Sequence, residues 1–158
     1  MLVRMQTNSG GGGGSSIDTT GIIYNAGQGT ENIFQGGWTS TNSYIITYPA
    51  LTGNTLTVNA GTPACGLIAS NFAITQKILD NFTYVCVDFI NTTTDGYAVF
   101  GLNNGTSTDT TSFNRGSTPF GTASGTKKIQ LTSAMLGAFV ACQCSNGRTI
   151  TITKMYFE

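Results

Sequence analysis

The sequence predicts an all-β protein: an antiparallel β-sandwich of two sheets, preceded by a short glycine-rich arm. From Ile17 onward, apolar residues recur at every second position in short runs separated by Gly, Asn, Asp and Pro. This alternation is typical of strands with one buried face, and the separating residues are typical of turns. Segments with helical periodicity are few and short. A chain of 158 residues suits one domain with its own core, so we expect a single sandwich.

The first sixteen residues differ in composition from the rest of the chain. Five consecutive glycines, 10–14, stand between serines, and such a run behaves as a flexible tether. The sequence therefore divides into an attachment arm, 1–16, and a sandwich domain, 17–158. The tip of the arm is a small apolar and basic peptide formed by Met1, Leu2, Val3, Arg4 and Met5.

Eight segments carry the strand pattern. In FTYVCVDF (82–89), we expect Val85, Val87 and Phe89 to point inward, because alternate residues of a strand share a face. The other segments are GIIYNA (21–26), SYIITYP (43–49), NTLTVNA (54–60), GYAVFGL (96–102), KKIQL (127–131), GAFVACQC (137–144) and TITITKMYF (149–157).

Turns and short helical segments separate these strands. Glycine is available for turn conformations in TGN (52–54), NTTTDG (91–96), NNG (103–105), ASG (123–125) and SNG (145–147). SNG lies between two alternating runs and predicts a β-hairpin. TSAMLG (132–137) predicts one helical turn that ends at Gly137. AITQKILDNF (73–82) is either a short helix or a bent strand.

The four cysteines are Cys65, Cys86, Cys142 and Cys144. Cys142 and Cys144 lie two apart on one predicted strand, so they share a face and are poorly placed to bridge each other. Either could face Cys65 or Cys86. The other interpretation is that these residues are small buried thiols. A zinc site is not expected, because the chain has no histidine and C-x-C is not the usual spacing of zinc ligands.

The composition argues against several classes of partner. Charged residues make up 9% of the chain, seven basic and seven acidic, which leaves little attraction for nucleic acid or an anionic membrane surface. No apolar run approaches the ~20 residues of a membrane-spanning helix, and the first ten residues lack the apolar stretch of a secretory signal. We expect no nucleic-acid partner, no membrane partner and no export by that route.

The sequence offers no catalytic motif. Because histidine is absent, the commonest general base is missing and no Ser-His-Asp triad can form. A glycosidase needs two carboxylates about 5–10 Å apart, and the acidic residues show no paired arrangement. The candidates for such a pair are Asp18, Glu31, Asp80, Asp88 and Asp95. We expect solvated turn or cap residues here, and no enzyme or cofactor. Asp95 and Asp109 could supply oxygens to calcium, but we predict no metal site.

Both ends of the domain resemble known proteins. IIYNAGQGTENIFQGGW (22–38) resembles the opening of a module of tailed bacteriophages and of prophages of gut bacteria. The ending, IQLTSAMLGAFVACQCSNGRTITITKMYFE (129–158), is similar to the last strands of jelly-roll domains of the carbohydrate-binding-module type. An apolar and basic start followed by a glycine run also resembles phage virion components. The resemblance implies a jelly-roll-like sandwich and a non-catalytic virion protein, whereas 60–128 shows no such likeness.

The single tryptophan, Trp38, directly follows a glycine pair that allows a sharp turn or a close approach. One interpretation places it over the core, with its indole N–H bonded to a carbonyl. The other makes it an exposed platform for a sugar ring, together with Tyr44, Tyr48 or Tyr97. These four aromatic residues are the candidate glycan-binding residues.

Two functions are compatible with these observations. The first is a structural component of a bacteriophage virion: a head fibre, capsid decoration or tail protein, made in the bacterial cytoplasm. Residues 1–16 would bind other virion proteins, the chain would form a homo-oligomer such as a trimer, and the sandwich would adhere to host-surface or environmental glycans. The second is a carbohydrate-binding module of a bacterial extracellular protein, commonly a monomer, in which 1–16 is a linker.

Overall fold

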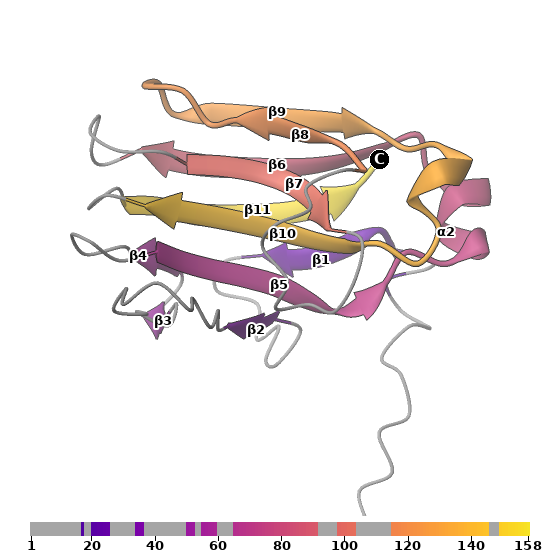
Figure 1. The fold of residues 1–158 in the computed structure, drawn as a ribbon, viewed down its shortest axis with the longest axis horizontal. Helices are drawn as coiled ribbons and strands as arrows, with labels where there is room; N and C mark the ends of the chain where they lie inside the picture. The colour runs from indigo at the N-terminus through magenta and orange to yellow at the C-terminus, as the bar shows by residue number, and fades with distance from the viewer. Residues whose placement is uncertain are drawn as a thin grey trace, which may run out of the picture.

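The computed structural model describes residues 17, 20–25, 34–36, 50–52, 55–59, 65–91, 98–103, 115–145 and 149–158, and these form two antiparallel sheets that lie face to face (Figure 1). Sheet A contains β1 (Ile22–Asn25), β3 (Ala50–Thr52), β4 (Thr55–Asn59), β6 (Tyr84–Asn91), β9 (Gly125–Gln130) and β11 (Thr149–Phe157). Sheet B contains β2 (Phe34–Gly36), β5 (Cys65–Ala73), β7 (Ala98–Asn103), β8 (Ser117–Pro119) and β10 (Phe139–Ser145). The predicted all-β sandwich is confirmed.

The strand order is that of a jelly roll. Strands pair in the order β4-β11-β6-β9 in sheet A and β5-β10-β7-β8 in sheet B. From β4 to β11 the chain changes sheet at every connection except the one between β7 and β8, as expected for a double-sheet jelly roll. Three further strands flank this set: β3 pairs with β4, β2 pairs with β5, and β1 pairs with the C-terminal part of β11.

The core lies between the sheets and is formed by alternate residues of each strand. Val85, Val87 and Phe89 of β6 point inward as predicted, and none of them is more than 4% exposed. Phe100 of β7 faces them from sheet B and is fully buried. The ring centre of Phe120, on the connection from β8 to β9, lies 4.6 Å from that of Phe89 and 6.5 Å from that of Phe100. The Phe120 ring therefore joins the two sheets.

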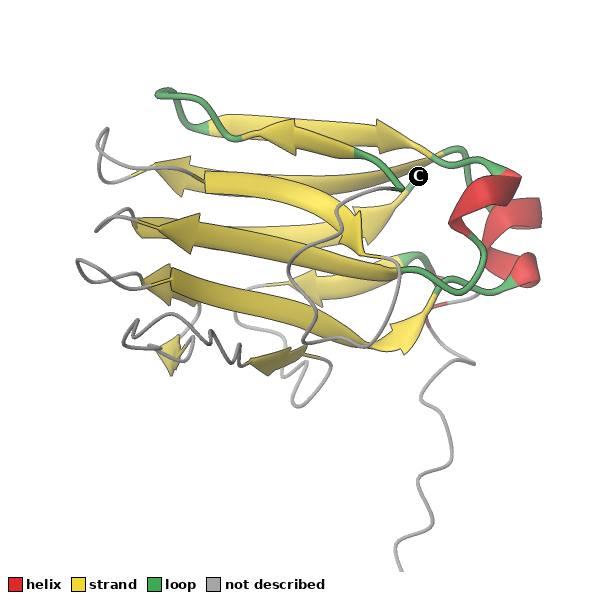
Figure 2. Ribbon diagram, viewed as in Figure 1, coloured by secondary structure: helices red, strands yellow, loops and turns green. Residues whose placement is uncertain are grey.

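Two short helical segments close one end of the sandwich (Figure 2). The segment whose sequence fits either a helix or a bent strand forms α2 (Gln76–Asn81). The Ile78 backbone N–H donates a hydrogen bond to Thr75 Oγ1 over 3.2 Å, which caps this helix. The turn predicted at 132–137 forms η1 (Ser133–Met135), followed by Gly137 with φ of 80°.

The hairpin predicted at SNG (145–147) is wrong. β10, before this segment, belongs to sheet B, and β11, after it, belongs to sheet A. Both edges of β10 are occupied, because it pairs with β5 on one side and with β7 on the other. The local turn signal is therefore overridden by pairing between distant strands, and the segment joins the two sheets. The predicted TGN turn (52–54), in contrast, does connect a paired hairpin, β3 and β4.

One long strand has no counterpart among the sequence expectations. β5, nine residues long, is rich in small residues and lacks regular alternation, so its sequence gives a weak strand signal. Its pairing with β10 and β2 defines it instead. The strand predicted at SYIITYP (43–49) lies outside the described residues.

The two cysteines whose side chains are described, Cys86 and Cys142, are buried thiols that form no disulfide, as the second interpretation of the cysteines proposes. Cys142 belongs to the core cluster and lies on β10 of sheet B. Cys86 lies on β6 between the inward-pointing Val85 and Val87, so its side chain is on the outer side of sheet A. The side chains of Cys65 and Cys144 lie outside the described part of the chain.

The start and the end of the sandwich lie together. β1 begins where β11 finishes, at the end that also carries α2 and η1 (Figure 1). The Phe157 backbone N–H donates a hydrogen bond to the Gly21 carbonyl over 2.6 Å, and the Glu158 backbone N–H donates one to the Tyr84 carbonyl over 2.9 Å. An arm that precedes residue 17 therefore joins the domain at this end.

Candidate functional site

Most residues singled out from the sequence fall outside the described part of the chain. They are the aromatic candidates Trp38, Tyr44, Tyr48 and Tyr97, the arm residues Met1, Leu2, Val3, Arg4 and Met5, and the acidic residues Asp18, Glu31, Asp95 and Asp109. Of the remaining two carboxylates, Asp80 is exposed on α2 and accepts a hydrogen bond from Gln76 Nε2 over 2.8 Å. Asp80 is thus a solvated helix residue, whereas Asp88 belongs to a polar cluster on sheet A.

This cluster covers the outer side of sheet A. Because Val85, Val87 and Phe89 of β6 point into the core, the alternating residues Tyr84, Cys86 and Asp88 lie on the opposite face. The backbone register places one residue of β9 and one residue of the C-terminal segment beside each of them. The three rows are Gln130, Tyr84 and Glu158; Lys128, Cys86 and Tyr156; and Thr126, Asp88 and Lys154. We call these nine residues the sheet A face.

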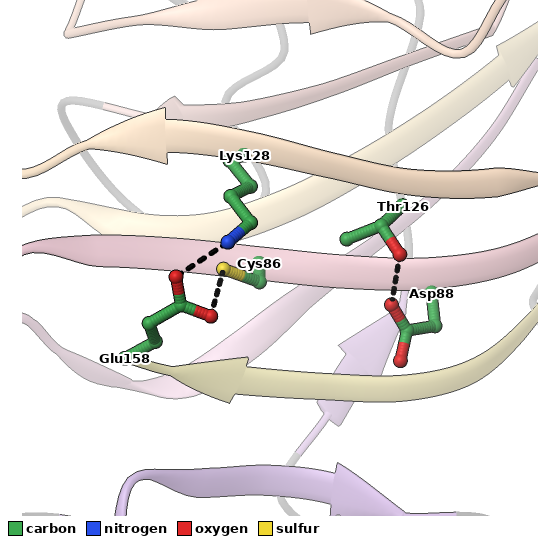
Figure 3. A network of polar contacts seen from close by, with 5 residues as sticks. All are labelled: Cys86, Asp88, Thr126, Lys128 and Glu158. Carbon is green, nitrogen blue, oxygen red and sulfur yellow. Dashed lines mark hydrogen bonds and ion pairs between the residues drawn. The ribbon is translucent and has the colours of Figure 1, made fainter.

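An ion pair crosses the middle of the sheet A face. Lys128 Nζ pairs with Glu158 Oε1, and both side chains are 45% exposed. Glu158 Oε2 lies 4.0 Å from Cys86 Sγ, so the pair spans the small central residue (Figure 3). Because solvent screens this exposed pair, it adds little to the stability of the fold. Its main effect is to fix a carboxylate and an ammonium group side by side.

The Cys86 thiol beneath the ion pair is poorly reactive at neutral pH. Cys86 is 0% exposed. Burial, followed by the negative charge of Glu158, raises the pKa of Cys86 to about 11 because both effects disfavour the thiolate. The hydrogen bond with Glu158 raises the pKa of Lys128. At neutral pH the centre of the face therefore holds a neutral thiol, an ammonium group and a carboxylate, and Cys86 is a poor nucleophile.

Asp88 is held in place from two sides. Thr126 Oγ1 donates a hydrogen bond to Asp88 Oδ1 over 2.6 Å (Figure 3). Thr153 Oγ1 donates one to the Asp88 backbone carbonyl over 3.2 Å. The Thr126 bond orients the carboxylate through one of its two oxygens, and the Thr153 bond holds the backbone of Asp88.

Two half-buried tyrosine rings lie diagonally across the sheet A face. Tyr156 is opposite Cys86 in the register, and Tyr84 is two residues from Cys86 on β6, so the rings are near neighbours. Lys154 Nζ lies 4.3 Å from the centre of the Tyr156 ring, and Lys128 Nζ lies 5.7 Å from that of Tyr84. Burial, followed by the charge of Asp88, raises the pKa of Tyr156, so its hydroxyl stays protonated at neutral pH.

The two carboxylates of the sheet A face come from different rows. Glu158 pairs with Tyr84, four residues from Asp88 on β6, and its carboxylate lies near the central residue, Cys86. Within the described ranges, no three His, Cys, Asp or Glu residues are grouped to hold a metal ion. The same part of the chain contains no helix long and apolar enough to cross a membrane.

The sequence did contain a signal for this face. In FTYVCVDF and TITITKMYFE, the residues that alternate with the core positions include Tyr84, Asp88 and Tyr156. The inward set predicts the strands, whereas the outward set does not by itself indicate a site. Which outward residues lie together depends on the pairing of β6 with β9 and β11, and these strands are far apart in the sequence.

Comparison with known proteins yields likeness in fold only. No protein-family model matches the chain, and no curated protein is similar to it. Among solved structures, a low-affinity xylan-binding module, CBM86, from the gut symbiont Roseburia intestinalis is similar with a TM-score of 0.49 and 10% identity, over 80% of this chain and 89% of that one. The enzymatically active domain of tailspike protein 4 of bacteriophage CBA120 is similar with a TM-score of 0.46 and 11% identity, over 80% of this chain and 19% of that one.

Proposed function

We propose that the chain is a non-catalytic structural component of a bacteriophage virion, a head fibre, capsid decoration or tail protein. Residues 1–16 attach it to other virion proteins, and the jelly roll adheres to glycans of the host surface or the environment. The observation that carries this proposal is the division of the sequence into an apolar and basic tip, a five-glycine tether and a β-sandwich. The resemblance of residues 22–38 to a bacteriophage module, and of the apolar and basic start with its glycine run to phage virion components, supports it.

The position of the junction supports display of the sandwich. The arm joins the domain beside Phe157, at the end with α2 and η1. Attachment through the arm therefore leaves the opposite end of the sandwich accessible. We further propose a homo-oligomer, such as a trimer, because several copies that each bind weakly gain avidity when they are held together.

The arm itself suits attachment to a partner. Ordering a glycine run costs roughly 1–2 kcal/mol per residue in backbone entropy. The apolar tip residues Met1, Leu2, Val3 and Met5 could each contribute roughly 1.5–3 kcal/mol if they were buried on a partner. Arg4 could add an ion pair. Together these contributions approach the cost of fixing a short segment, so a partner surface would be needed to order it.

We also propose that the protein catalyses no hydrolysis. The absence of histidine from the sequence supports this, because histidine is the commonest general acid or base.

A second candidate function is a carbohydrate-binding module of a bacterial extracellular protein. The observation that favours it is the sheet A face, in which two tyrosines lie among charged and hydroxyl side chains. In that case residues 1–16 would be a linker and the chain would be a monomer. Light scattering of the purified full chain separates the candidates, because a trimer has three times the mass of a monomer.

Deletion of residues 1–16 tests the proposed function. The truncated chain should retain the melting temperature of the full chain to within about 2 °C, because the arm is outside the sandwich core, but it should be missing from purified particles. A second variant, Leu2→Ser with Val3→Ser and Met5→Ser, keeps the tether length and removes only the apolar tip. It should also fail to be incorporated. Incorporation of both variants at the level of the full chain would refute attachment through the arm.

A further inference from the structure

The two outer faces of the sandwich differ in character. On sheet B, Val99 and Ala141 point away from the core, yet they are only 2% and 0% exposed. These outward positions are therefore apolar and covered. On sheet A, the rows of the sheet A face carry mainly polar, charged and aromatic side chains, and both members of the Lys128–Glu158 pair remain 45% exposed. The next outward residue of β6, Ile90, is apolar and 48% exposed. Sheet A therefore presents a continuous group of exposed polar and aromatic side chains to a ligand, whereas these central positions of sheet B do not.

The charges of the sheet A face indicate the class of ligand. Lys128 and Lys154 balance Asp88 and Glu158, and the two signs are interspersed within three neighbouring rows. Such a face offers no net attraction to a polyanion such as nucleic acid. It offers fixed donors and acceptors close together, which suits a neutral ligand with many hydroxyl groups.

The two tyrosines supply the apolar part of recognition. A sugar ring has apolar C–H faces and a polar hydroxyl rim, and an aromatic ring provides a rigid apolar surface with a polar hydroxyl at its tip. Tyr84 and Tyr156 lie diagonally across adjacent strands, with Glu158 and Lys128 beside them. A few oriented polar groups around apolar contact surfaces are typical of small-molecule sites.

We propose that the sheet A face binds a neutral oligosaccharide, whose sugar rings contact Tyr84 and Tyr156 and whose hydroxyl groups bond to Asp88, Glu158 and Lys128. This inference rests on the proposed adhesive function and assigns it to described residues. In this arrangement Thr126 orients Asp88, and Glu158 and Lys128 orient one another, so the polar groups are positioned before the ligand arrives. Cys86 has the smallest side chain of the three central residues on β6, which leaves room beside it for the Lys128–Glu158 pair.

Affinity electrophoresis of the full chain tests this site. The native gels contain one of three soluble neutral polysaccharides, arabinoxylan, mixed-linkage β-glucan or galactomannan, and polygalacturonate serves as the charged control. At least one neutral polymer should retard the wild-type chain, and polygalacturonate should not. Tyr84→Ala and Tyr156→Ala should each weaken the apparent affinity at least tenfold, while Tyr84→Phe and Tyr156→Phe, which keep the ring, should retain most of it.

A pair of lysine variants separates a binding role from a structural one. Lys128→Ala should weaken retardation, because the ammonium group lies on the sheet A face. Lys127→Ala should not, because Lys127 is the adjacent residue of the same strand and pairs with the inward-pointing Val87. Melting temperatures of all variants identify any loss that is due to unfolding.

The outcomes distinguish this inference from the proposed function. Retardation that survives the alanine variants would overturn the sheet A site and leave glycan adhesion at another part of the chain. Retardation by polygalacturonate alone would overturn the neutral class of ligand. A wild-type chain that is retarded by none of the neutral polymers would overturn both the site and the adhesive function. Attachment to the virion is tested separately by the arm variants.

Discussion

Replacement of Gly21 by alanine tests how the chain enters the sandwich. Gly21 has φ of +71°, and a Cβ at this position would lie 2.6 Å from the Phe157 carbonyl oxygen and 2.9 Å from Cε1 of the Phe82 ring. Gly121 provides a matched control, because its φ is +75° and a Cβ there would meet nothing within 4 Å. Both variants incur the cost of a left-handed alanine, about 1–2 kcal/mol. Only Gly21→Ala also forces the backbone of β11 to move.

We expect this displacement to cost a further 1–3 kcal/mol or so, the usual range for overpacking. Urea denaturation of the full-length variants at 25 °C measures the loss of unfolding free energy directly. In a thermal scan, the melting temperature of Gly21→Ala should lie roughly 2–12 °C below that of Gly121→Ala, at about 2–4 °C per kcal/mol for a domain of this size. Equal destabilisation of the two variants, within about 0.5 kcal/mol, would refute the close packing of β1 against β11.

Two further predictions concern the core and alkaline pH. Phe120→Ala should lower the unfolding free energy by about 3–5 kcal/mol, because it removes a buried ring that contacts both sheets, and a loss below about 1 kcal/mol in urea denaturation would contradict a shared core. The free energy of unfolding should also fall as pH rises above 9, the ordinary pKa of a thiol. The unfolded chain releases the Cys86 proton near that pH, whereas the native chain, in which the pKa of Cys86 is about 11, still holds it. The rise in the pKa of Cys86 corresponds to a loss of at most about 3 kcal/mol of unfolding free energy. The raised pKa values of Tyr156 and Lys128 act in the same direction. Cys86→Ala should show a shallower decline between pH 9 and 11 in urea denaturation, and a slope equal to that of the wild type would show that the thiol is not the cause.

The sequence predicted those parts of the fold that depend on local alternation. β6 and β11 have strict period-two patterns with large apolar residues such as Val85 and Phe157, and both were expected as strands. β5 was missed because small residues dominate it, and its conformation is determined by pairing with β10 and β2. The SNG segment failed as a hairpin for a related reason. Turn residues specify a bend, but the partner of each strand is decided by distant segments.

The candidate site was harder to predict than the fold. Tyr84, Asp88 and Tyr156 are visible in the sequence as the outward set of two strands, but their grouping with Lys128 and Glu158 requires the register of three strands. Glu158 in particular reaches the face because its backbone pairs with Tyr84. The glycan-binding role of Trp38, Tyr44, Tyr48 and Tyr97 and the attachment role of residues 1–16 stay predictions, since these residues lie outside the described part of the chain.

Labelling of intact phage particles tests the central claim, display of this sandwich on a virion, most directly. Antibodies raised against the purified 17–158 domain, coupled to gold and viewed by electron microscopy, should bind at regular positions on the particle surface. Particles produced with the chain lacking residues 1–16 should carry no label. If gold is absent from wild-type particles and the chain is found only in the soluble fraction after the particles have been sedimented, the protein is not a virion component.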